Sequence, residues 1–157
     1  MVNELLPKRI DNTYRGAKLA PWLFAVLLFM NTGISLNCIF NGYSVATSAD
    51  GIPLDTFPPG AAQTIVSDFA LWGLSQFMLC LLGILVLARY RSMIPFMFAL
   101  LLLEYSSRKL ILHFLPVVKI GTPPGFYVNL ILLVLMLVGL VLSLWSHGNR
   151  QVLESAS

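Results

Sequence analysis

The sequence predicts an all-α protein, an integral membrane four-helix transmembrane bundle with both termini in the cytoplasm. Hydrophobic residues make up 57% of the 157 residues and charged residues only 11%, whereas a soluble domain carries about 25% charged residues. A chain of this length cannot bury that much apolar surface in a water-soluble core. The apolar residues also gather in four continuous segments, so we expect one transmembrane domain spanning residues 1–157, with helices at about 21–43, 64–88, 92–115 and 125–146.

Each segment has the length of a helix that crosses a bilayer. About 20 residues at a rise of about 1.5 Å per residue span the hydrocarbon core of roughly 30 Å. The segments lack the strict alternation of a barrel strand. A helix also satisfies its own backbone hydrogen bonds, which lipid cannot do.

The first segment, 21–43, begins at Pro21, a residue that suits the first turn of a helix. A cleaved signal peptide is the alternative, but its apolar core is only about 7–15 residues long. The segment is longer and carries Asn31 and Asn37. We therefore expect an uncleaved first helix.

The later segments are separated by turn residues. Helices 64–88 and 92–115 are joined by the short turn "ARYRS", so they should be antiparallel neighbours in a compact bundle. Pro116 closes the third helix, and "TPPG" precedes the fourth, 125–146.

The positive charges give the orientation. Of the ten Lys and Arg residues, seven flank the apolar segments on one side: Lys8, Arg9, Arg15, Lys18, Arg89, Arg91 and Arg150. The loop at 44–63 has no Lys or Arg. The positive-inside rule places both termini and the ARYRS turn in the cytoplasm, with Lys119 as the one exception among the loops.

The third segment holds an unusual ionisable cluster, "LLLEYSSRKLILHF". Glu104 lies about 18 Å along the helix, slightly past the midplane, and Arg108 follows one turn later. In the structural interpretation the two form a pair, while Arg108 and Lys109 extend to the headgroups. In the functional interpretation, Glu104 and Arg108 line a polar pocket that opens outward and holds a lipophilic ligand with a polar head.

Other polar residues recur at helical spacing on the first two helices. Asn31 belongs to a stripe on the first helix, and Asp68, Trp72 and Gln76 form one on the second. Asp68 should lie at a depth close to that of Arg108 and could compete with Glu104 for it. Ordinary helix–helix hydrogen bonding is the alternative for both stripes. The candidate ligand-binding residues are Glu104, Arg108, Asp68, Asn31, Gln76, Trp72 and Tyr105.

Several kinds of chemistry have no support in the sequence. Cys38 and Cys80 should lie at opposite depths, too far apart for a disulfide. His113 and His147 are expected on opposite sides and cannot share a metal or haem. There is no phosphate loop or HExxH motif, and the basic residues do not interleave with aromatic residues as in nucleic-acid binding. We name no catalytic residue, metal ligand or cofactor.

The middle of the chain resembles the DoxX-like group of small bacterial four-helix membrane proteins. The features that carry the resemblance lie within about 60–146: a second helix ending "LLGILVLARYRS", and a third helix with a late basic cluster, "LLLEYSSRKLILHF". The acidic residue and glycine of that group's second helix are matched here only by "SDFALWG". The resemblance implies an up-down bundle in the bacterial inner membrane. Members of the group have been linked to quinone-dependent sulfur oxidation and to membrane oxidoreductase complexes.

Three functions remain open from the sequence. The first is a non-enzymatic accessory or binding protein that holds a lipid or quinone-like lipophile or joins a larger membrane complex. The second is a quinone-linked membrane oxidoreductase component that uses Glu104 or Asp68 to handle protons. The third is a small transporter, which would need a homo-oligomer to build a path.

Overall fold

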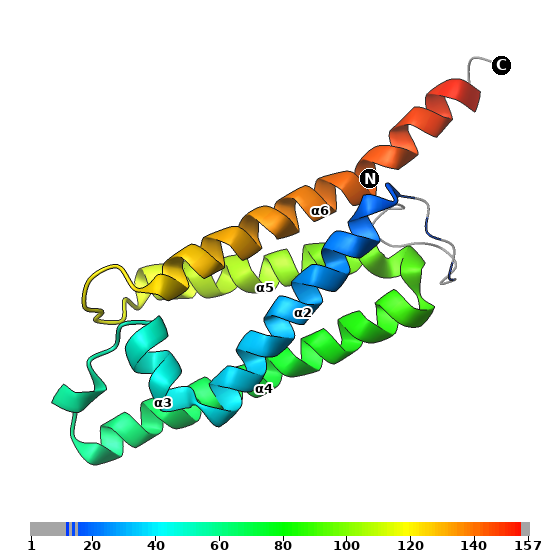
Figure 1. Ribbon diagram of the computed structural model, residues 1–157. Coiled ribbons are helices and arrows are strands. Elements are labelled where there is room, and N and C mark those ends of the chain that lie inside the picture. Colours follow the sequence, from blue (N-terminus) through cyan, green and yellow to red (C-terminus); the bar gives the residue numbers. More distant parts are fainter. Residues whose placement is uncertain (1–11, 13, 15, 155–157) are drawn as a thin grey trace.

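The computed structural model describes residue 12, residue 14 and residues 16–154, with side-chain environments through Trp145. Within these residues every regular element is helical, as the fold class predicts. The four long helices are α2 (Leu19–Phe40), α4 (Pro59–Arg89), α5 (Ile94–Phe114) and α6 (Pro124–Glu154) (Figure 1). Of the charges used for orientation, Lys8, Arg9, Arg15 and the side chain of Arg150 lie outside the described part, as does the side chain of His147.

Each long helix overlaps an expected segment, and the largest differences are at the ends of α4 and α6. Pro59 occupies the first turn of α4, where its missing N–H costs no hydrogen bond. The helix therefore begins five residues before the apolar segment does. At the other end of the chain, α6 continues past the apolar segment to Glu154.

Three of the four long helices are long and apolar enough to cross a membrane, rather than the four that were expected. The candidate spans are Leu19–Phe40, Pro59–Arg89 and Pro124–Trp145, with mean hydropathies of 1.9, 2.1 and 2.7. The remaining helix, α5, has 21 residues and is long enough. Any stretch of 18 residues within it contains the charged residues Glu104, Arg108 and Lys109, and this charge content separates α5 from the three candidate spans.

The helices pack as two closely associated pairs, α2 with α4 and α5 with α6, and α2 also contacts α6 (Figure 1). The tight turn Arg91–Met93 makes α4 and α5 consecutive, as expected, but the main packing partner of α4 is α2. Gly73 explains the close approach of α2 and α4. A Cβ at that position would lie 2.7 Å from the Cβ of Cys38 and 2.8 Å from the carbonyl oxygen of Ser35.

The main core lies between α2, α5 and α6, with Val86 of α4 at its edge, and contains aromatic and aliphatic side chains. Phe24 and Phe98 are fully buried in it, with ring centroids 5.1 Å apart. Outside the core, large apolar side chains face away from the protein, and Phe29 is 82% exposed. Such a contiguous apolar exterior is typical of a lipid-facing surface.

A smaller cluster forms at the end of the bundle where the chain leaves α2. Here a short helix, α3 (Gly42–Ser44), leads into a π-helical turn at Val45–Ala49 and a 3₁₀ turn at Leu54–Thr56. Ala46, Ile52 and Leu54 are buried against Phe69 of α4. This cluster fixes the loop beside the first turns of α4 and so builds one wall of the pocket described next.

Candidate ligand-binding site

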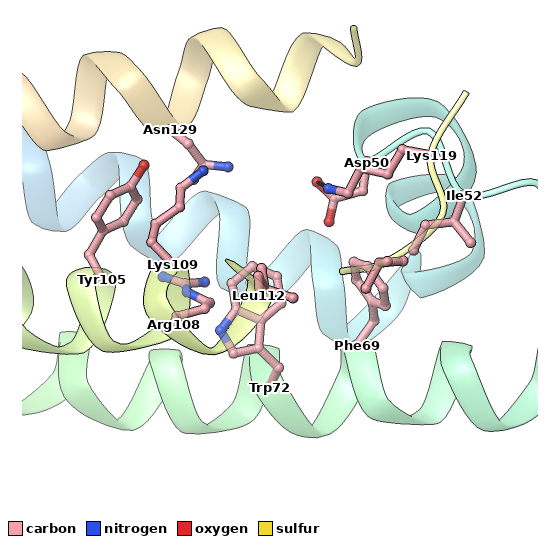
Figure 2. Close-up of a pocket in the computed structure, with 11 residues that line it drawn as sticks. Asp50, Ile52, Phe69, Trp72, Tyr105, Arg108, Lys109, Leu112, Lys119 and Asn129 are labelled. Carbon is pink, nitrogen blue, oxygen red and sulfur yellow. Dashed lines mark ion pairs between the residues drawn. The ribbon is translucent and has the colours of Figure 1, made fainter. Parts of the chain in front are cut away.

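A pocket of about 210 Å³ lies at the end of the bundle opposite the Arg91–Met93 turn, between α4, α5, α6 and two loops (Figure 2). Its walls combine apolar, aromatic and charged side chains. The residues that line it are Asp50, Ile52, Phe69, Trp72, Tyr105, Arg108, Lys109, Leu112, Val117, Lys119 and Asn129.

Two loops that are distant in sequence are fastened together at the pocket. The backbone N–H of Ile120 donates a hydrogen bond of 2.8 Å to the carbonyl oxygen of Gly51. Beside it, Nζ of Lys119 lies 3.7 Å from Oδ1 of Asp50. Gly51 has a φ of 71°, in the left-handed region that glycine adopts readily. The tight turn at this glycine brings Asp50 and the 115–123 loop to the same edge of the pocket.

The loop that carries Asp50 and Gly51 is also held by a contact between Tyr43 and Asp55. The hydroxyl of Tyr43 donates a hydrogen bond to the carboxylate of Asp55. This hydrogen bond, together with a smaller effect of desolvation, raises the pKa of Tyr43 above its usual value of 10.0. The phenol therefore stays a hydrogen-bond donor throughout the neutral pH range.

Arg108 contacts three other side chains at the pocket. Its Nη2 donates a hydrogen bond of 3.1 Å to Oε2 of Glu104, one turn earlier on α5. Its guanidinium carbon lies 4.5 Å from the ring centroid of Trp72 and 5.8 Å from that of Tyr105. An arginine stacks favourably over aromatic faces, most strongly over tryptophan. The carboxylate and the two rings therefore hold the guanidinium at the pocket wall.

Lys109 has a different environment. Its Nζ lies 5.7 Å from the ring centroid of Tyr105 and 5.9 Å from that of Phe126. Among the residues that the structure describes, no carboxylate lies within ion-pair distance of it. In Figure 2 its side chain extends from α5 toward Asn129 on α6.

The seven candidate residues fall into three groups. Trp72, Tyr105 and Arg108 line the pocket, and Glu104 adjoins it as the ion-pair partner of Arg108. The expected i, i+4 pair is therefore present. These four of the seven candidates lie together in space.

Asn31 and Gln76 lie elsewhere, buried between α2 and α4. Nε2 of Gln76 donates to Oδ1 of Asn31 over 3.4 Å, and Asn31 donates to the carbonyl oxygen of Leu27 over 3.0 Å. This is the interhelical hydrogen bonding that was the alternative interpretation of both stripes. Neither residue lines the pocket.

Asp68 also lies outside the pocket. It is exposed on α4 and forms no ion pair with Arg108, whose carboxylate partner is Glu104. The buried line of α4 runs through Gly73, Gln76 and Cys80. At about 100° per residue, Asp68 is rotated by about 80° from Gln76, which turns it out of the bundle.

The loops contribute pocket residues that were not among the candidates, chiefly Asp50, Ile52 and Val117. Lys119 was visible in the sequence as the one cation on the side expected to lack them. Its position close to Asp50 gives that exception a structural reason. Asn129 and Lys109 were also visible as polar residues in apolar segments.

No cluster of three or more His, Cys, Asp or Glu side chains suited to a metal occurs within the described residues. Cys38 and Cys80 are both free thiols and both buried in the α2–α4 interface. Comparisons with protein-family models, curated proteins and solved structures found no match.

Proposed function

We propose that this protein is a non-enzymatic membrane protein that binds a lipid-like amphiphile, with the polar head of the ligand in the pocket beside Arg108. The observation that carries the proposal is the composition of the pocket. Ile52, Phe69 and Leu112 supply apolar surface, while Arg108, Lys109 and Asn129 supply polar groups. Sites with a few polar groups on apolar walls are typical of small-molecule binding.

The size of the pocket suits a headgroup and not a whole lipid. Its volume is about 210 Å³, below the roughly 300–1,000 Å³ of pockets that enclose drug-sized ligands. The hydrocarbon part of the ligand would lie along the outer surface of the bundle. There the apolar side chains of Leu110, Ile111 and Phe126 are exposed near the pocket residues of α5 and α6.

The depth of the pocket supports the same function, if α5 is the fourth membrane span. Arg108 lies 14 residues after Ile94, which is about 21 Å along the helix. The ionisable residues of α5 are thus confined to the half nearest the pocket. Long basic side chains at such a position reach the headgroup region.

Orientation is part of the proposal. Lys18, Arg89 and Arg91 lie at the end of the bundle away from the pocket (Figure 1). The positive-inside rule assigns that end, with both termini, to the cytoplasm, and the pocket to the outer face of a bacterial inner membrane. The ligand would then enter from the outer leaflet.

Native mass spectrometry of the protein extracted gently from its own membrane, with lipid extraction of the same sample, tests this function. The structure offers a matched pair of variants. Val117→Trp places an indole in the pocket, whereas Val118→Trp alters the neighbouring residue, which is 73% exposed and does not line it.

The expected result is one small lipophile per chain in the native protein and in Val118→Trp, and its loss from Val117→Trp. A lipid, a quinone or another amphiphile would each support the proposal. Protein free of any lipophile, whether found in a larger membrane complex or as a bare homo-oligomer, would contradict it.

A further inference from the structure

We infer that the pocket selects an anionic head, a phosphate or a carboxylate, and that Lys109 is the residue that makes this selection. The inference rests on the proposed function, because it names the chemical class of the ligand at the same site. The first support is charge. Three cations, Arg108, Lys109 and Lys119, line the pocket together with a single carboxylate, Asp50.

The carboxylates near the pocket already form ion pairs with cations other than Lys109. Asp50 pairs with Lys119, and Glu104 pairs with Arg108. Lys109 alone among the three pocket cations lacks a carboxylate partner in the described structure. Its ammonium lies near the rings of Tyr105 and Phe126, which attract a cation but do not neutralise its charge.

Further hydrogen-bond donors surround the same space. A guanidinium has five N–H groups, and Arg108 uses Nη2 for Glu104. The indole N–H of Trp72 is buried without an acceptor, and in Figure 2 it lies on the Arg108 side of the pocket. A buried donor without a partner is uncommon. A head with several acceptor oxygens could bind the remaining N–H groups of Arg108 and the ammonium of Lys109 together.

Other kinds of head fit these groups less well. A choline group would bring a second cation close to Lys109 and Arg108, with Asp50 already paired. A neutral head would leave the charge of Lys109, whose side chain is exposed, without a counterion. A phosphate or carboxylate both neutralises Lys109 and accepts hydrogen bonds from the surrounding donors.

The test compares ligands that differ only in the head. The full-length protein in a neutral detergent is titrated with phosphatidylglycerol, with phosphatidylcholine of the same acyl chains and, separately, with inorganic phosphate, and binding is followed by native mass spectrometry. The variants are Lys109→Gln, Lys109→Arg and, as a control, Lys18→Gln, which removes an exposed lysine at the opposite end of the bundle.

We expect phosphatidylglycerol to bind at least about tenfold more tightly than phosphatidylcholine, the change that one charge-assisted hydrogen bond commonly carries. Lys109→Gln should abolish most of this preference by weakening phosphatidylglycerol alone. Lys109→Arg should keep the preference, and Lys18→Gln should leave it unchanged.

The other outcomes separate the two proposals. Equal binding of both lipids, blocked in Val117→Trp, would overturn anion selection and leave the amphiphile site standing. Binding of neither lipid, with inorganic phosphate bound in a manner that depends on Lys109, would support the anion site but assign it to a soluble ligand. Binding of none of the three would overturn both.

Discussion

The guanidinium of Arg108 on α5 lies 4.5 Å from the ring centroid of Trp72 on α4. These two helices make few other direct contacts with each other. On its other side Arg108 is bound by Glu104. Both partners of this ion pair are about a quarter exposed, with side-chain exposures of 27% and 26%. The pair therefore holds Arg108 at the pocket wall, while Glu104 lies beside the pocket and not in its lining.

Removing only one partner of this pair should be worse than removing both. Glu104→Gln leaves the Arg108 charge without its carboxylate, which we expect to lower stability by about 1–2 kcal/mol, less than for a fully buried pair. Replacing both residues with leucine should recover much of this loss. Thermal unfolding in detergent measures the effect, and equal, negligible shifts in Glu104→Gln, Arg108→Leu and the double variant would show that the pair has no structural role.

The stability of the ligand-free protein should depend on the ring face of Trp72 and not on its N–H group. Trp72→Phe keeps an aromatic face for Arg108 and removes an indole N–H that has no acceptor. Trp72→Leu loses the aromatic face and should cost about 1 kcal/mol more than Trp72→Phe. The comparison is made by thermal unfolding of the ligand-free protein, and a Phe variant less stable than the Leu variant would exclude the stacking role.

Hydropathy located the four long helices, because each contains a continuous apolar segment of helical length. It did not separate α5 from the three candidate membrane spans. The charge pattern placed Glu104 and Arg108 correctly, since i, i+4 spacing alone brings such residues together. Asp68 and Gln76 do not line the pocket, although helical spacing made them candidates, because this spacing does not say which neighbouring helix a face meets. Gln76 meets Asn31 on α2, and Asp68 is turned outward.

The loop residues of the pocket were beyond prediction for a different reason. Asp50 reaches the pocket through the left-handed turn at Gly51 and a backbone hydrogen bond to Ile120. Such contacts join segments that are far apart in sequence, and no local pattern encodes them. The only signal was the unexplained cation at Lys119, whose partner is Asp50.

The close packing of α2 and α4 should depend on Gly73. An alanine there would place its Cβ 2.7 Å from the Cβ of Cys38 and 2.8 Å from a backbone oxygen, so the helices must separate. We expect Gly73→Ala to lower stability by about 1–3 kcal/mol.

Gly33→Ala is the matched control for this variant, because nothing lies within 4 Å of a Cβ at Gly33. Alanine at this position should be neutral or slightly stabilising, as in a helix interior. Thermal unfolding of both variants in the same detergent makes the comparison. Similar shifts for the two variants would mean that helix propensity, and not packing, sets the effect.

The hydrogen bond from Tyr43 to Asp55 predicts a stability difference that depends on alkaline pH. Because this bond raises the pKa of Tyr43 above 10.0, its contribution is fully present below that pH. It is lost as the pH rises through the raised pKa and the phenol loses its proton. Tyr43→Phe should therefore be less stable than the native protein at about pH 8, and the difference should shrink above the raised pKa.

Thermal unfolding across the alkaline range tests this pH dependence. Tyr127→Phe serves as the control, since Tyr127 is exposed and makes no hydrogen bond to a carboxylate within the described structure. It should show no such trend. A Tyr43→Phe difference that is constant from neutral to strongly alkaline pH would contradict the role assigned to the hydrogen bond.

The ion pair between Asp50 and Lys119 should affect ligand affinity more than stability. Partly exposed pairs contribute only about 0–1 kcal/mol to folding, and the hydrogen bond between Ile120 and Gly51 remains when either side chain is neutralised. Asp50→Asn removes the carboxylate that lines the pocket and releases Lys119, so an anionic head should bind about three- to tenfold more tightly. Lys119→Gln should have the opposite effect, because it removes a cation and leaves Asp50 unpaired. Titration with phosphatidylglycerol measures both variants, and affinity changes of the same sign would show that this pair acts by holding the loops and not by its charge.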